Sequence, residues 1–335
     1  MNKVIILLGP TGVGKTGVSL LLAKNLKTEI ISADSMQIYR NMDIGTAKAS
    51  PAERKCVTHH MIDVAEPWEM FSTGKYIAAM KPIIEYLLMQ GKIPIVVGGT
   101  GLYIRAMTRG IFSGPSADWT LREELLTIEQ EGRGTLYDSL KILDPVAVEK
   151  ITPNDTRRLI RALEVCFKGR SKISELQKRL TRPLPYDFIK IGITRKREEL
   201  YRLIEERVDK MIEAGLIEEV KTVMNLMSEH AQIQAAARKK QDEKNQVSTI
   251  REHEYSTLPS FQAIGYKEIV RHLRGEFGLS EAINLIKKAS KRYAKRQFTW
   301  FRKEEDIRWV DITGITDPHE VLCKINPVLE KLSTS

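Results

Sequence analysis

The chain has 335 residues, 42% of them hydrophobic and 29% charged, with 21 glycines and 13 prolines. This composition is that of an ordinary globular protein. It excludes a collagen-like or wholly disordered chain, and the length predicts two domains rather than one. Lysine and arginine number 53 against 43 aspartates and glutamates, a formal charge of +10. Such an excess indicates either a simply basic enzyme or a polyanionic partner, nucleic acid above all.

Cysteine usage and apolar runs point to a compartment. Cys56, Cys166 and Cys323 lie far apart without the spacing of a zinc site, which indicates a reducing compartment. No apolar run approaches the ~18 residues of a membrane-spanning helix. The N-terminal stretch runs straight into a glycine-rich loop without a small-residue cleavage site, so we expect no signal peptide. We therefore expect a cytoplasmic protein without a membrane partner.

Strand and helix patterns alternate over the first hundred residues. Short apolar runs at Val4–Leu8, Glu29–Ser32 and Ile93–Val97 predict buried strands. Apolar residues at helical spacing predict helices over about 15–26 and 77–92. This alternation is typical of an α/β fold around a parallel sheet.

The pattern then changes to helices alone. Between Asp118 and about Lys178 the sequence has only helical periodicity, and a strand pattern returns at 188–193. Residues 231–256 are polar, charge-rich and without sustained periodicity, which predicts a mobile surface segment. The predicted boundaries are 1–114 and 186–335 for an α/β core that ends in a basic helix, and 115–185 for an all-helical insertion domain.

A glycine-rich loop joins the first predicted strand to the first helix. It consists of Gly9, Pro10, Thr11, Gly12, Val13, Gly14, Lys15 and Thr16, and it fits the pattern GxxxxGK[ST]. In this pattern backbone N–H groups and the lysine surround phosphate groups, and the threonine hydroxyl can bind Mg²⁺. The loop predicts a bound diphosphate or nucleotide and leaves open whether ATP occupies the site.

Two further strand ends should face the same crevice, because the carboxyl ends of parallel strands meet at one edge of a sheet. Asp34 follows the second strand, where it is either a catalytic base or a simple turn residue. The strand Ile93–Val97 ends in Gly98-Gly99-Thr100, without the metal-binding aspartate that an ATPase normally supplies there. These glycines and Thr100 suit the close approach of a ligand.

Positively charged residues on three predicted helices indicate contacts with anions. In the helix Lys196–Gly215, Arg207 falls within the apolar stripe, where it either snorkels or points at a buried anion. Beside a diphosphate site we favour the anion. Residues 287–303 hold eight Lys or Arg, no acid and four aromatics, which predicts an RNA-facing surface. Three arginines within 157–161 indicate a second phosphate-facing surface.

Several segments resemble one enzyme family in sequence and order. They are GPTGVGKT, ISADSMQIYRNMDIGTAKAS, THHMIDVAEP, VVGGTGLYIRAM, NDTRRLIRALEV, RVDKMIEAGLIEEV, FQAIGYKE and KRYAKRQFTWFRK. Together they are similar to the tRNA dimethylallyltransferases, or tRNA isopentenyltransferases, over about residues 3–305. IGTAK, GGTGLY and GYKE make the resemblance more specific than the phosphate loop alone. The three cysteines provide no appended zinc finger, as in the bacterial type.

The resemblance implies a fold and an activity. The fold is a P-loop NTPase-like parallel sheet with an inserted all-helical domain. The activity is transfer of a dimethylallyl group from dimethylallyl diphosphate to the exocyclic N6 amine of the adenosine 3′-adjacent to the anticodon in tRNA, with release of diphosphate. The implied partners are dimethylallyl diphosphate and the tRNA anticodon stem-loop, with Mg²⁺ as cofactor, and we expect a monomer.

The resemblance also implies roles for individual residues. Asp34 is the implied general base, while Thr16 and Arg207 act on the diphosphate and Thr16 also holds the metal. The implied tRNA-contacting residues are Asp34, Ser35, Met36, Gln37, Thr100, Arg122, Arg157, Arg158, Leu159, Ile160, Arg161, Ala263, Ile264, Gly265, Tyr266, Lys267 and Glu268. Arg157 stands where the family often has glutamine.

Two other functions fit parts of the sequence. An ATP-dependent small-molecule or nucleoside kinase explains the phosphate loop and Asp34, but it does not explain the basic segment 287–303. A non-catalytic RNA-binding nucleotide switch explains that segment and gives Asp34 and Arg207 no task.

Overall fold

The computed structural model describes residues 2–112, 114–169, 171–241 and 258–333. The chain forms two compact units, Met1–Ile104 with Pro185–Ser335, and Arg105–Leu184. The second unit thus begins at Arg105, earlier than the predicted residue 115. The reason is that the chain pairs with itself where it enters and leaves this unit: the N–H of Leu184 donates to the carbonyl of Met107 (3.0 Å).

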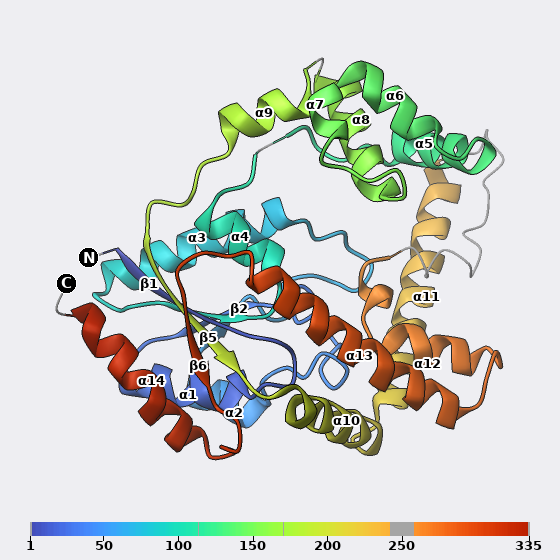
Figure 1. Ribbon diagram of the computed structural model, residues 1–335. Coiled ribbons are helices and arrows are strands. Elements are labelled where there is room, and N and C mark those ends of the chain that lie inside the picture. Colours follow the sequence, from blue (N-terminus) through green and yellow to red (C-terminus); the bar gives the residue numbers. More distant parts are fainter. Residues whose placement is uncertain (1, 113, 170, 242–257, 334–335) are drawn as a thin grey trace. The chain divides into compact units, whose positions relative to one another are not determined.

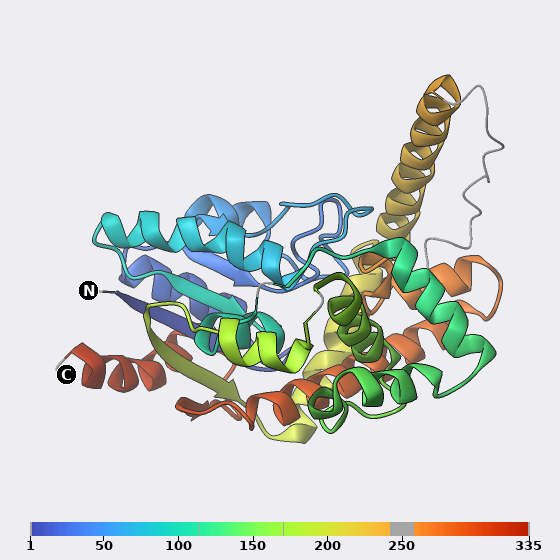
Figure 2. The same cartoon turned by 90° about the horizontal axis from the view of Figure 1, so that it is seen from above.

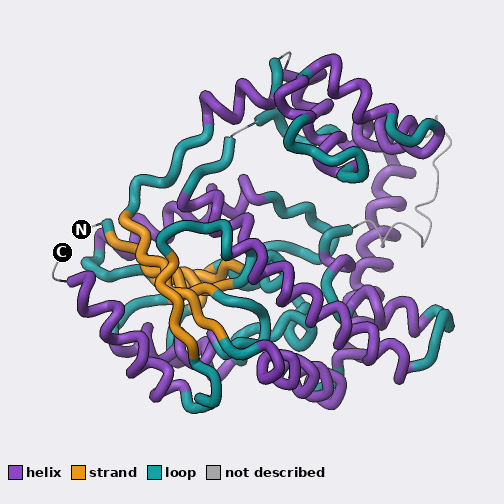
Figure 3. The backbone as a smooth tube through the Cα atoms, in the orientation of Figure 1, coloured by secondary structure: helices purple, strands orange, loops and turns teal. Residues whose placement is uncertain are grey.

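The first unit is built on a six-stranded sheet in which every strand pair is parallel (Figures 1 and 3). The strands are β1 (Lys3–Leu8), β2 (Ile30–Ala33), β3 (His59–His60), β4 (Ile95–Gly98), β5 (Asp187–Thr194) and β6 (Ile307–Asp311), in the order β3-β2-β4-β1-β5-β6. Gly98 pairs with Leu8 on one side and with Ala33 on the other, so β1, β2 and β4 end level. This confirms the predicted α/β class and brings the loops after these three strands together.

Helices cover both faces of this sheet. Those of the first unit are α1 (Lys15–Asn25), α2 (Pro51–Cys56), α3 (Thr73–Met89), α4 (Gly101–Thr108, which continues into the second unit), α10 (Arg197–Glu213), α11 (Leu216–Gln241), α12 (Tyr266–Leu273), α13 (Leu279–Phe301) and α14 (Pro318–Ser333), with a 3₁₀ helix at Ser260–Gln262. The crossovers that contain α1 and α3 run in opposite directions along the sheet. Because such crossovers are right-handed, α1 and α3 lie on opposite faces (Figures 1 and 2).

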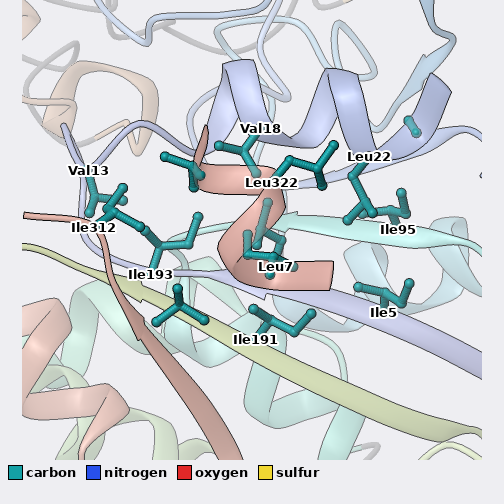
Figure 4. Close-up of a cluster of buried hydrophobic side chains, with 14 of the residues drawn as sticks. Ile5, Leu7, Val13, Val18, Leu22, Ile95, Ile191, Ile193, Ile312 and Leu322 are labelled. Atoms are coloured by element: carbon teal, nitrogen blue, oxygen red, sulfur yellow. The ribbon is translucent and has the colours of Figure 1, made fainter. Parts of the chain in front are cut away.

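The main core lies between the sheet and the pair α1 and α14. Side chains alternate along a strand, so Ile5 and Leu7 of β1 face these helices and contact Leu22 and Leu322 in one cluster (Figure 4). Val4, Ile6 and Leu8, which alternate with these residues along β1, face the opposite side of the sheet and are also fully buried. Burial on both faces explains the continuous apolar runs that the sequence shows for these strands.

A second core packs α10, α11, α12 and α13 against the loop that follows β2. It includes Tyr39, Met42, Val220 and Tyr266. Helix α11 extends to Gln241, so the start of segment 231–256 is helical, although its lack of apolar periodicity does not predict a helix. A run of alanines at 235–237 supplies strong helix formers without an apolar stripe. The rest of that predicted mobile segment lies outside the described residues.

The second unit contains α5 (Trp119–Glu131), α6 (Thr135–Leu143), α7 (Pro145–Val148), α8 (Thr156–Gly169) and α9 (Ile173–Leu180). Its described residues form no strand, as predicted for the insertion. It has a core of its own, in which Leu125, Leu140, Leu159 and Leu163 pack together.

The sequence predicts a core that ends in a basic helix, but α13 is not the last element of the chain. It is followed by β6 and α14, and β6 forms one edge of the sheet. Only Val310 of this strand is buried, so β6 lacks the apolar run by which the other strands are recognised. Throughout the described ranges, no helix is both long and apolar enough to cross a membrane.

Candidate active site

A cavity of about 490 Å³ lies within the first unit, at the edge of the sheet where β1, β2 and β4 end. Its size suits a small-molecule ligand. Several parts of the chain line it. They are the phosphate loop with the start of α1, the ends of β2 and β4 with the loops that follow them, His59 and Ile62, helices α10 and α13, and residues 262–265.

The phosphate loop lines the cavity with part of its length. Gly12 (φ 79°) and Gly14 (φ 105°) adopt the left-handed conformation that favours glycine, and a Cβ on Gly12 would lie 2.7 Å from the Ile204 side chain. Val13 instead packs in the core and does not line the cavity. The loop residues that line the cavity are Thr11, Gly12, Gly14, Lys15 and Thr16.

The ammonium group of Lys15 lies inside this loop. Its Nζ donates to the carbonyls of Gly9 and Pro10, each at 2.9 Å. Burial lowers the Lys15 pKa to about 8, an effect that nearby Asp34 opposes and nearby Arg207 reinforces. A cation held beside the backbone of a glycine-rich loop is the arrangement expected for a phosphate-binding site.

Asp34 lies directly after β2 and is held from both sides. Its Oδ1 accepts the N–H of Met36 (2.9 Å), which fixes the carboxylate in a turn. Thr100, in the loop after β4, donates its N–H to Ala33 (3.1 Å), and its Oγ1 accepts the N–H of Ser35 (3.0 Å). Asp34 is thus bracketed by two hydrogen bonds from one neighbouring residue.

Arg207 lines the same cavity from α10. Burial lowers the pKa of its guanidinium, and the negative charge of Asp34 opposes that change. The sequence allowed Arg207 either to snorkel toward solvent or to point at a buried anion. In the structure Arg207 lines the cavity, with Asp34 as a charged neighbour. Asp34, Lys15 and Arg207 therefore form one electrostatic cluster.

Glu219 of α11 holds the loop after β2, which forms part of the cavity lining. Its carboxylate accepts the N–H groups of Asp43 (2.8 Å), Ile44 (2.7 Å) and Gly45 (2.9 Å), and it also accepts the Tyr266 hydroxyl. A Cβ on Gly45 would lie 2.4 Å from the Tyr266 ring, so the loop and the ring are in close contact. The sequence did not single out Glu219.

Residues 263–268 divide between the cavity and the fold. Ala263, Ile264 and Gly265 line the cavity. Tyr266 is fully buried, Lys267 is exposed, and Glu268 accepts the N–H of Gly265 (2.8 Å) as the first turn of α12 begins. Tyr266 and Glu268 therefore shape this segment rather than face a ligand. On the loop after β2, Ser35, Met36 and Gln37 line the cavity as well.

Helix α13 also faces the cavity, which the sequence did not predict. Ile286, Ser290, Tyr293, Arg296 and Gln297 line it at helical spacing. The signal was present, because a polar residue such as Gln297 on the inward face of a helix is unusual in a core.

The aromatic residues of this helix differ from the prediction. Phe298 packs against the main core, Phe301 is fully buried, and the Trp300 ring lies 2.4 Å from the point where a Cβ on Gly101 would stand. These three rings therefore take part in packing within the protein. Tyr293 faces the cavity, and burial raises its pKa, with the charge of Asp34 adding to the effect.

The basic side chains of α13 fall into two groups. Lys287 pairs with Asp209 of α10 (2.7 Å), and Lys291 pairs with Glu205 of the same helix. A second group is exposed to solvent: Lys288, Arg292, Lys295 and Arg296.

The remaining predicted RNA contacts lie in the second unit. Arg122 binds the fully buried Glu164 through Nε (2.9 Å) and Nη2 (2.8 Å), and Arg161 also binds that carboxylate. Leu159 and Ile160 point into the core of the unit, so their side chains are closed to a ligand. The exposed members of this set are Arg157 and Arg158, the latter paired with Asp155 (3.2 Å).

A metal ion at this site would take its ligands from the protein, the substrate and water together. Among the described residues no cluster of three or more His, Cys, Asp or Glu could hold an ion. Mg²⁺ at phosphate sites keeps several waters and takes only one or two protein ligands. Thr16, at the start of α1 and in the lining of the cavity, fits such a site.

Comparison with known proteins gives the family. The family model described as "IPP transferase" matches residues 37–304. A tRNA dimethylallyltransferase of Thermodesulfovibrio yellowstonii is 56% identical over 316 residues, which cover 94% of each chain. The chain belongs to the IPP transferase family. The resemblance found in the sequence motifs is thereby confirmed.

Solved structures of similar proteins agree with this family. The structure of a full-length tRNA isopentenylpyrophosphate transferase from Bacillus halodurans is 38% identical to this IPP transferase, with a TM-score of 0.68. The match covers all of this chain and 98% of that one. A eukaryotic dimethylallyltransferase captured acting on tRNA is 28% identical, with a TM-score of 0.81, over all of this chain and 80% of that one. The P-loop-like parallel core therefore follows the family's fold.

Proposed function

We propose that this IPP transferase transfers the dimethylallyl group of dimethylallyl diphosphate to the exocyclic N6 amine of the adenosine 3′-adjacent to the anticodon in tRNA. The observation that carries the proposal is that one cavity combines a phosphate loop with a carboxylate, Asp34, and two cations, Lys15 and Arg207. The names of the relatives, tRNA dimethylallyltransferase and tRNA isopentenylpyrophosphate transferase, support the same substrates.

The residues divide the chemistry between them. The N6 nitrogen attacks the allylic carbon, the C–O bond to the diphosphate breaks, and Asp34 accepts the proton that leaves the amine. Lys15, Arg207 and the loop amides stabilise the charge that gathers on the departing diphosphate. Thr16 would hold Mg²⁺, which supplies further positive charge beside the diphosphate.

The apolar part of the lining suits the allylic tail. Met36, Met211 and Ile286 line the cavity together with the polar cluster. An allylic centre that develops positive charge must be kept from water, which would otherwise take the place of the amine. The target base has to leave its stack to reach Asp34.

Contacts with tRNA are assigned to both units. In the core we propose Asp34, Ser35, Met36, Gln37 and Thr100, with residues 263–265 and Lys267. In the insertion we propose Arg122, Arg157, Arg158 and Arg161. We propose that a monomer is active. The three cysteines are free thiols, in keeping with a reaction in the cytoplasm.

The kinase alternative is disfavoured. β4 ends in Gly98 and is followed by Gly99 and Thr100, so no carboxylate stands there to hold the metal of ATP. The relatives over the full length are named as transferases that act on tRNA. A passive nucleotide switch leaves the cluster of Asp34, Lys15 and Arg207 unexplained.

The test is a transfer assay on tRNA. Purified protein, Mg²⁺ and unmodified tRNA are incubated with dimethylallyl diphosphate or with ATP, and digested nucleosides are identified by mass spectrometry. We expect dimethylallyl-adenosine only with the allylic donor. A tRNA with guanosine in place of the target adenosine serves as the control and should stay unmodified. Unmodified tRNA together with ATP turnover would favour the kinase.

A further inference from the structure

A buried glutamine of α13 connects two loops of the cavity. Gln297 is 6% exposed, and both ends of its amide are used. Its Oε1 accepts the N–H of Thr11 in the phosphate loop (2.8 Å), and its Nε2 donates to the carbonyl of Gly99 after β4 (2.8 Å). A single side chain therefore spans the loop that would hold the diphosphate and the loop beside Asp34.

The connection continues from Gly99 to Asp34. Thr100, the next residue, donates its N–H to Ala33 and accepts the N–H of Ser35, so it grips the chain on both sides of Asp34. Tyr293, one turn before Gln297 on α13, lines the same cavity. The phosphate loop and the turn of Asp34 are thus joined through a short run of hydrogen bonds.

We propose that Gln297 is a positioning residue that sets the spacing between the diphosphate cradle and the general base. This role rests on the proposed transferase function. Thr11, Gln297, Gly99 and Thr100 form the link, which we call the Gln297 bridge. The allylic carbon has to lie between the leaving diphosphate and the amine whose proton goes to Asp34. A shift in the distance between the two loops therefore acts on the rate of transfer.

Gly99 is shaped to fit this glutamine. A Cβ on Gly99 would lie 2.3 Å from Gln297 Nε2, and the next nearest atoms, Gln297 Cδ and the Gly9 carbonyl oxygen, are each at 3.4 Å. An alanine at this position would therefore clash severely with Gln297 alone among these neighbours. The two residues should behave as a coupled pair in mutagenesis.

The experiment is a double-mutant cycle with Gly99→Ala, Gln297→Ala and both together. Single-turnover transfer is measured with saturating tRNA and donor, so that the amplitude reports the active fraction and the rate constant reports the chemistry. We expect each single variant to lose roughly 10²-fold in rate constant at little loss of amplitude, because small misplacements of reacting groups have costs of this order. The second substitution should cost almost nothing in the background of the first.

Two further variants make the result specific. Gln297→Met keeps the side-chain volume and removes both hydrogen bonds, so it should lose rate as Gln297→Ala does while the dissociation constant for tRNA is unchanged. Gln90→Ala changes an exposed glutamine and should have no effect. Rate constants that stay at the wild-type value, with amplitude alone reduced, would overturn the positioning role, and so would additive losses in the cycle. If the wild type itself transfers nothing, the proposed function fails and takes this role with it.

Discussion

The chemistry of the site depends on a few residues whose environments are unlike those of ordinary surface groups. Lys15 is held by two loop carbonyls, the half-buried Arg207 has the charge of Asp34 nearby, and Asp34 is fixed by a backbone N–H and by Thr100. Each of the three was predicted from the sequence by its motif or by its place in a helical stripe. The proximity of Asp34 to the phosphate loop was also predicted, because the carboxyl ends of parallel strands meet at one edge of a sheet.

Asp34→Asn tests the general base with the least structural change. The Asn Oδ1 can still accept the N–H of Met36, so the turn should persist. The transfer rate constant should fall by ~10²–10⁴ because the amine proton has no acceptor. The dissociation constant for tRNA, measured by filter binding, should stay near the wild-type value. Asp138→Asn, at an exposed position of the insertion, is the matched control. An equal loss of tRNA binding would contradict the base assignment.

Lys15 makes diphosphate binding depend on pH. Its folded pKa is about 8, so the free protein loses this charge as pH rises through that value. A bound diphosphate favours the charged form and raises the pKa again, so binding between about pH 8 and 9 should be accompanied by proton uptake. Calorimetry of dimethylallyl diphosphate in buffers of different ionisation enthalpy measures this uptake.

Lys15→Met provides the reference for that titration, since the diphosphate itself also titrates. The uptake assigned to Lys15 is the difference between the wild type and the variant. Equal uptake in both proteins would show that the ammonium of Lys15 does not titrate on binding.

At the scale of elements, helices α10 and α13 matter most, because both face the cavity and each other. Lys287 and Lys291 of α13 pair with acids of α10, while Lys288, Arg292 and Lys295 are exposed. The charge pattern predicts a basic helix correctly. It does not separate the charges that pair within the protein from those left for a polyanion, because the partners lie on another helix.

The exposed group should contact tRNA phosphates. Replacing Lys288, Arg292 and Lys295 by alanine should weaken tRNA binding and flatten its salt dependence, by ~0.7–0.9 in slope for each phosphate that the variant no longer neutralises. The double variant Lys287→Ala, Lys291→Ala also removes two charges, but they are already paired, so its slope should change less. Equal slopes for the wild type and the triple variant, in binding titrations from low to high salt, would exclude this face of α13 from the RNA interface.

Glu219 connects α11 to the loop at 43–45, part of which lines the cavity. Its carboxylate accepts three backbone N–H groups and the Tyr266 hydroxyl. Glu219→Gln places an N–H₂ group among these donors, which should lower the free energy of unfolding by about 1–3 kcal/mol. Urea unfolding measures the change.

The neighbour Glu218 provides the control, because it is exposed and pairs with Lys221 at the surface (2.8 Å). Glu218→Gln should be nearly neutral. An equally small effect of Glu219→Gln would mean that the loop at 43–45 does not depend on α11.

For the whole molecule, the order of local patterns predicted most of the fold. Apolar runs and helical spacing predicted β1, β2, β4 and β5 and most of the helices, because both faces of the central sheet are buried. β6 was missed because an edge strand needs no apolar run. The helical start of segment 231–256 was not predicted because its sequence has no apolar stripe. Gln297 and Glu219 were missed because their partners are distant in sequence, 286 residues away for Gln297 and Thr11.

In the proposed reaction, the N6 amine of adenosine replaces the diphosphate on the allylic carbon, and no ATP is used. The most direct measurement is the stoichiometry of the reaction: diphosphate released against dimethylallyl-adenosine formed, with purified tRNA and dimethylallyl diphosphate and no nucleotide present. We expect one diphosphate for each modified adenosine, and no orthophosphate. Diphosphate release without modification of tRNA would mean that water rather than the amine reaches the allylic carbon, and a requirement for ATP would contradict the transferase reaction proposed for this cavity.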